Sequence, residues 1–112
     1  MGRDKNKKRS APFVMVPKDM LKSSAWLSLS NIAKVAWLHL AADFNGKEQK
    51  RTSLRLPYSQ AEKLMTRKSY SKALTELQAK GFIRKTKHGG LEKNCSEYEL
   101  IYEWRKWTPK DE

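Results

Sequence analysis

The order of elements between residues 57 and 102 constrains the fold of this chain more than any other feature. Two helical patterns flank a short polar break at residues 66–69, and the second pattern ends at Gly81. An apolar pair, a basic run, a Gly89-Gly90 pair and a second strand pattern follow. Two adjacent glycines permit the tight turn of a hairpin. The segment therefore predicts helix, turn, helix, strand, turn and strand, in that order.

The spacing of apolar residues predicts which faces of these two helices are buried. In each helix the apolar residues recur at intervals of three and four, which is the repeat of one helical face. We expect Ser59 to cap the first helix, with Glu62 as its capping-box partner. The residues expected to face the core are Ala61, Leu64 and Met65 in the first helix, and Tyr70, Ala73, Leu74 and Leu77 in the second.

Three further elements complete the expected fold. Residues 31–44 predict a helix that is apolar on nearly every face, so we expect it to be buried on more than one side. It is either the central helix of the domain or also part of a dimer interface. Residues 53–58 alternate and predict an edge strand, since Pro57 cannot donate a ladder hydrogen bond. Trp104 and Trp107 are expected to fold back and close the core.

The length of 112 residues suits one domain. The apolar stripes predict an α+β domain over residues 13–107, with a three-helix core and a small antiparallel sheet. Residues 1–12 are expected to form a flexible basic arm, because they lack core-forming side chains, and residues 108–112 a tail. The single cysteine, Cys95, cannot form an internal disulfide, and we see neither a signal peptide nor a membrane span. We therefore expect a cytoplasmic protein.

The charge of the chain favours an anionic partner. Lys and Arg number 24 against 12 Asp and Glu, which gives a formal net charge of +12. An excess of this size points first to nucleic acid and second to an acidic membrane surface. The alternative is a basic protein whose charge serves solubility alone. The basic residues gather in residues 1–12, 45–55, 62–72 and 80–93 rather than spreading evenly.

The outward face of the second helix is the main candidate site. An α-helix fits the major groove of DNA, and residues near its N-terminus reach base edges, where arginine pairs bidentately with guanine. We expect Glu76 to lie on this outward face too. The hairpin around Gly89-Gly90, called the wing, and the arm would contact phosphates or the minor groove. The candidate DNA-binding residues are Arg67, Lys68, Ser69, Ser71, Lys72 and Thr75 in the helix, Lys85, Lys87, His88 and Lys93 in the wing, and Arg3, Lys5, Lys7, Lys8 and Arg9 in the arm.

From Trp26 to Trp104 the chain resembles winged helix-turn-helix DNA-binding proteins of bacteria, phages and plasmids. The resemblance lies in the AW pair at 25–26, FNG at 44–46, where the helix at residues 31–44 ends, LPY at 56–58, the glycine pair and YEL at 98–100. The run ALTELQAKGFI at 73–83 resembles the junction between recognition helix and wing in transcriptional regulators and replication initiator domains. The resemblance implies a winged helix that binds double-stranded DNA, in transcription regulation or in replication of a mobile element. Since no effector domain is appended, no small-molecule ligand is inferred.

Other function classes stay open or fit less well. An RNA-binding or ribosome-associated protein would also suit the charge, although no stacked-aromatic RNA-binding pattern is visible. A protein-interaction module or a homodimer would use the apolar helix at residues 31–44. Neither a phosphate-binding loop nor a metal-ligand spacing occurs, so we expect no enzyme, cofactor or metal. Glu97, Glu99 and Glu103 are expected to face solvent or to pair with nearby lysines.

Overall fold

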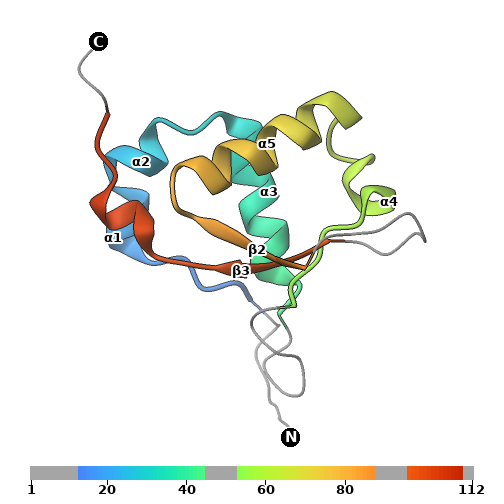
Figure 1. Cartoon of the computed structure of the whole chain (residues 1–112), viewed down its shortest axis with the longest axis horizontal. Coiled ribbons are helices and arrows are strands. Elements are labelled where there is room, and N and C mark those ends of the chain that lie inside the picture. The colour runs from blue at the N-terminus through green and yellow to red at the C-terminus, as the bar shows by residue number, and fades with distance from the viewer. Residues whose placement is uncertain (1–12, 45–52, 88–95, 110–112) are drawn as a thin grey trace, which may run out of the picture.

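The computed structural model describes residues 13–44, 53–87 and 96–109. These ranges form a small α+β domain with five α-helices and a two-stranded antiparallel sheet (Figure 1). The elements in chain order are α1 (Lys18–Leu21), α2 (Ser24–Leu27), α3 (Asn31–Ala42), α4 (Tyr58–Ala61), α5 (Arg67–Ala79), β2 (Ile83–Lys87), β3 (Glu97–Leu100) and a 3-10 helix, η1 (Glu103–Lys106). None of the helices in these ranges combines the length and the apolar content needed to cross a membrane.

Helices α3 and α5 are the two long helices, and α5 lies across α3 (Figure 1). Each begins at a hydroxyl cap. The Ser30 side chain accepts a hydrogen bond from the Ala33 amide, and the Thr66 side chain accepts one from the Ser69 amide. Such caps satisfy amides that have no partner inside the helix. The break between α4 and α5 runs from Glu62 to Thr66 and so lies earlier in the chain than expected, because α4 ends at Ala61 and α5 already begins at Arg67. The side chains buried between these helices include Ala33, Ala36, Trp37 and Leu40 of α3 and Ala73, Leu74 and Leu77 of α5.

The helix α3 is not buried all round in the single chain. Ile32 and Leu38 keep 37% and 38% of their surface exposed, on a helix whose other apolar side chains are largely packed inside. α3 ends at Ala42, two residues earlier than its apolar pattern predicts. The expected pairing of two copies through this helix stays a prediction.

The segment from Ser53 to Met65 differs most from the sequence-based expectation. It contributes a single antiparallel bridge, Leu54 to Tyr98, instead of an edge strand. Tyr58 already starts α4, since Pro57 has a backbone compatible with the position before a helix and cannot donate to a ladder. The capping box at Ser59 is wrong, because Pro57 occupies the N-cap without any side-chain bond. Leu64 follows the single turn of α4 and is 41% exposed, whereas Ala61 and Met65 are buried.

The hairpin pairs β2 with β3 in antiparallel register, with Ile83 opposite Leu100 and Lys85 opposite Tyr98. Two ion pairs hold this side of the domain: Arg84 to Glu99 across the hairpin, and Arg55 to Glu97 at 3.0 Å. The partners of the two acids are thus arginines and not the expected lysines. Residues 88–95, which include the predicted tip of the wing, lie outside the described residues.

A turn at Gly81 joins α5 to β2 and is packed against η1. Gly81 has a φ of 84°, in the left-handed region that glycine tolerates. Its carbonyl accepts a hydrogen bond from the Trp104 amide at 3.1 Å, and the Phe82 carbonyl accepts one from the Ile101 amide at 3.0 Å. The Phe82 ring stacks on Trp104, with centroids 6.0 Å apart, and meets Trp26 edge to face at 5.9 Å. The prediction that Trp104 folds back to close the core is confirmed.

Replacing Gly81 by Ala should destabilise the domain by about 1–3 kcal/mol from the strained φ alone. A Cβ at this position would also lie 2.7 Å from Glu103 Cβ and 2.8 Å from the Trp104 backbone nitrogen, so neighbouring backbone must shift. Urea denaturation followed by tryptophan fluorescence measures the loss. Ser71→Ala, on the exposed face of α5, is the control and should leave the free energy of unfolding nearly unchanged. Equal midpoints for the two variants would contradict this account of the turn.

Candidate nucleic-acid interface

The buried and exposed residues of α5 divide its surface into two faces. Ala73, Leu74 and Leu77 are buried and Tyr70 is half-buried, as the apolar spacing predicts. The opposite side, called the α5 face, consists of exposed residues, with Ser69 half-buried at its margin. The members of the α5 face are Arg67, Lys68, Ser71, Lys72 and Thr75. The structure therefore brings together all six residues that the sequence assigns to this helix.

The basic side chains of the α5 face have few competing contacts. All three, Arg67, Lys68 and Lys72, belong to the first half of the helix. Within the described ranges none of the three makes an ion pair or a hydrogen bond through its side chain. The positive end of the helix dipole lies at the same end. This half of α5 thus presents positive charge to solvent that no acid of the described ranges neutralises.

The only acid of α5, Glu76, bonds to the start of α3 and not to the cations of the α5 face. The two carboxylate oxygens of Glu76 accept hydrogen bonds from the Ser30 amide at 2.9 Å and the Ser30 hydroxyl at 2.8 Å. Lys80 reinforces the contact, since its Nζ reaches the Ser28 carbonyl at 3.1 Å and Glu76 at 3.5 Å. The expectation that Glu76 points outward with the basic residues is therefore wrong. Its bonds join the second half of α5 to the start of α3 and leave the first half basic.

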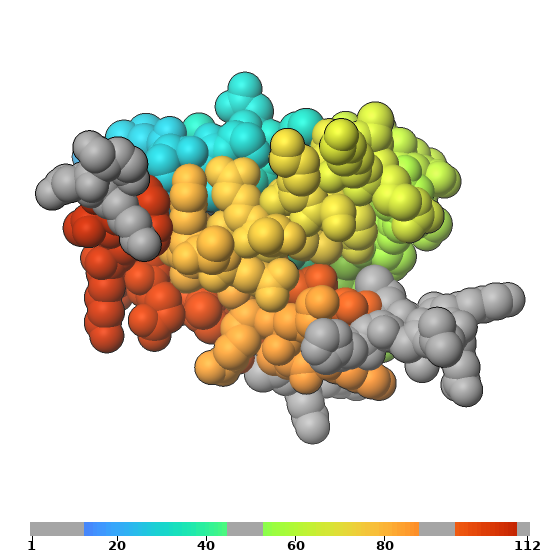
Figure 2. Space-filling view, turned by 45° about the horizontal axis from the view of Figure 1, so that its top comes forward, coloured from blue at the N-terminus to red at the C-terminus, as the bar shows by residue number. Residues whose placement is uncertain are grey.

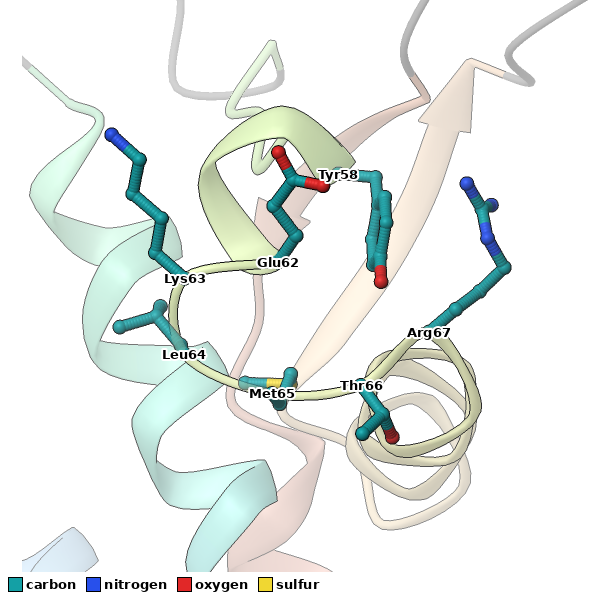
Figure 3. Close-up of a pocket in the computed structure, with 7 residues that line it drawn as sticks. All are labelled: Tyr58, Glu62, Lys63, Leu64, Met65, Thr66 and Arg67. Carbon is teal, nitrogen blue, oxygen red and sulfur yellow. The ribbon is translucent and has the colours of Figure 1, made fainter.

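An arginine–tyrosine contact that the sequence did not predict lies where α4 meets α5. The Arg67 guanidinium carbon is 4.1 Å from the centroid of the Tyr58 ring, within the range of a cation–π contact. Figure 3 shows the two side chains next to each other at the rim of a shallow open depression. The chain between them turns through Glu62, Lys63 and Thr66, which also line the depression (Figure 3). The two residues belong to different helices, so the periodicity of the sequence does not predict the contact.

The strand β2 adds basic side chains next to α5. Figure 2 shows α5 in yellow and β2 in orange side by side on one face of the molecule. Lys85 is half-buried and Lys87 is exposed, and neither pairs with an acid among the described residues. The other predicted wing residues, His88 and Lys93, lie outside the described residues, as do all five arm residues, Arg3, Lys5, Lys7, Lys8 and Arg9.

This arrangement suits a long anionic surface better than a small enclosed ligand. The 13 residues of α5 span about 20 Å at the rise of an α-helix, with the cations grouped at one end. The depression beside Arg67 is open rather than enclosed (Figure 3).

Comparisons of the chain with protein-family models, with curated proteins and with solved structures found no match.

Replacing Glu76 by Ala should destabilise the fold by about 1 kcal/mol, because it removes two charge-assisted hydrogen bonds at the start of α3. Thermal denaturation followed by circular dichroism measures the effect. Glu62→Ala is the matched control: it deletes an exposed glutamate that makes no bond to any described residue. Glu76→Gln should lie between the two, since one acceptor oxygen remains. If both alanine variants melt at the same temperature, the Glu76–Ser30 contact contributes nothing to stability.

Proposed function

We propose that this protein binds double-stranded DNA, with the first half of α5 in the major groove and the β2–β3 hairpin against the neighbouring backbone. One observation carries the proposal. The exposed cations Arg67, Lys68 and Lys72 gather at the N-terminal end of a long helix and have no ionic partner in the described ranges, while the helix's only acid bonds to Ser30. Lysine and arginine that neutralise phosphates supply most of the affinity of such proteins for DNA.

The order of elements supports a winged helix as the scaffold. α3, α4 and α5 would be its three-helix core, α4 and α5 its helix-turn-helix, and the β2–β3 hairpin its wing. The bridge between Leu54 and Tyr98 sets a third extended segment beside β3. In helix-turn-helix proteins the second helix of the pair enters the major groove and its N-terminal residues contact base edges. In this chain that position belongs to Arg67 and its neighbours.

The dimensions of the site favour duplex DNA over RNA. The major groove of B-DNA is about 12 Å wide and admits an α-helix, whereas the major groove of A-form RNA is too deep and narrow for side chains to reach. The candidate residues of α5 lie on one helical face, as insertion into a groove requires. Ser71 and Thr75 supply hydroxyls that bond either bases or phosphates. Together with the sequence resemblance, this supports a role in transcription regulation or in replication of a mobile element.

A matched pair of charge deletions tests the proposal. Lys72→Gln removes a cation from the α5 face, and Lys18→Gln removes one from the exposed surface of α1. Each lost phosphate contact lowers the slope of log affinity against log salt by about 1. We therefore expect a flatter slope for Lys72→Gln and an unchanged slope for Lys18→Gln. Fluorescence anisotropy with a labelled duplex across a salt series provides the measurement.

Two results would contradict the proposal. Equal effects of Lys72→Gln and Lys18→Gln would mean that the net charge, and not the α5 face, governs binding. Structured RNA that outcompetes every duplex would replace DNA by RNA as the ligand. Structured RNA and unlabelled duplex DNA are used as competitors in the same salt series, so that their affinities are compared under identical conditions.

A further inference from the structure

We infer that Tyr58 is a positioning residue, which holds Arg67 so that its guanidinium contacts one guanine in the major groove. The inference rests on the proposed binding of duplex DNA and adds a division of roles within the α5 face. Arg67 would discriminate between base pairs, while Lys68 and Lys72 would contact phosphates without discriminating.

The contact between Tyr58 and Arg67 restrains the arginine from one side. The guanidinium carbon lies 4.1 Å from the ring centroid, closer than any other cation–π contact among the described residues. A guanidinium that rests on an aromatic ring uses its flat surface for the contact and keeps its N–H groups for hydrogen bonds. Those groups donate to no acceptor within the described residues. Arg67 is thus restrained in position, while its N–H groups have no hydrogen-bond partner in the described part of the chain.

The Tyr58 ring is itself fixed by neighbours on α5 and before α4. It meets the Tyr70 ring edge to face, with centroids 5.5 Å apart. The Tyr70 hydroxyl donates a hydrogen bond to the Leu56 carbonyl at 2.8 Å, which ties Tyr70 to the chain just before α4. Tyr58 follows Pro57, whose ring fixes its own φ. The Tyr58 ring, which Arg67 contacts, is therefore held by residues of both helices of the proposed helix-turn-helix.

An acid in the turn after α4, Glu62, lies on the other side of the Tyr58 ring from Arg67. In Figure 3 the Tyr58 ring stands between Glu62 and Arg67, and these two charged residues form no ion pair. An ion pair would occupy the N–H groups that a guanine requires. Without the ring, the flexible arginine side chain would gain conformations that the contact now excludes, and each of these must be given up on binding.

Lys68, the next residue along the helix, provides the contrast within the site. It is exposed and has no contact of this kind in the described ranges. An ammonium group on a free stem suits a phosphate, whereas a restrained planar fork suits the O6 and N7 acceptors of guanine. The geometry therefore assigns discrimination to Arg67.

The test begins with selection of a preferred site from a randomised duplex pool by the wild-type protein. Binding of the selected duplex and of its single base-pair variants is then measured for Tyr58→Phe, Tyr58→Leu, Arg67→Ala and Lys68→Ala. Tyr58→Phe keeps the ring and deletes only a hydroxyl that makes no bond to any described residue. Tyr58→Leu deletes the ring and keeps an apolar side chain against Tyr70.

We expect Arg67→Ala to lose roughly 10-fold of preference at one G·C pair, as loss of a bidentate contact requires. Tyr58→Leu should lose roughly 5-fold at that same pair, and Tyr58→Phe none. In the Arg67→Ala background, Tyr58→Leu should have no further effect, because the tyrosine acts through the arginine. Lys68→Ala should weaken all duplexes alike and flatten the salt slope, which neither Tyr58 variant should do.

Several outcomes would overturn the inference while leaving DNA binding intact. These are full preference in Tyr58→Leu, equal loss in Tyr58→Phe and Tyr58→Leu, or a loss spread over every base pair. If Tyr58→Leu does not fold, Arg67→Lys replaces it, since it keeps the charge on an exposed position and loses the planar fork. Retained preference in Arg67→Lys would also overturn the inference. If the wild-type protein binds no duplex at all, the proposed function itself fails.

Discussion

The turn at Gly81 and Phe82 is the constraint on which the arrangement of the domain depends. The chain leaves α5 with a positive φ at Gly81, and the hydrogen bonds of this turn connect it to the segment that follows β3. Phe82, fully buried, lies against Trp26 and Trp104 from opposite ends of the chain. Because α5 and β2 meet at this turn, it fixes the helix relative to the hairpin. The two parts of the proposed DNA interface therefore keep one geometry before any ligand arrives, which lowers the entropic cost of binding.

The distribution of acids shapes the surface as much as the excess of lysine and arginine. Glu76 bonds to Ser30, Glu97 pairs with Arg55 and Glu99 with Arg84. Each of these acids bonds to a residue outside the first half of α5, and none of them pairs with a cation there. Exposed ion pairs contribute little to stability. Their larger effect is on the surface charge, because the acids that they use do not pair with the cations of α5. The result is a basic helix end beside a basic strand, which the net charge alone does not predict.

The sequence predicted the parts of the structure that depend on local periodicity. The inner stripe of α5 and the two hairpin strands follow from spacing within one element, and the structure contains both. The expectation failed at residues 53–58, where alternation suggested a strand but Pro57 allowed α4 to start at Tyr58. The Glu76–Ser30 and Tyr58–Arg67 contacts were not predictable, because their partners lie on different elements. Ser30 and Glu76 are 46 positions apart, and only the packing of α5 on α3 brings them together.

The most direct test of the central claim is a nuclear magnetic resonance titration of the ¹⁵N-labelled protein with a selected DNA duplex. The account predicts that the largest changes in backbone amide shift fall in Arg67 to Lys72 and in β2, with small changes in α1 and α2. The face that carries α5 and β2 is the one that Figure 2 shows. Changes concentrated in α1, α2 or the exposed side of α3, with α5 unaffected, would contradict the claim that the α5 face binds DNA.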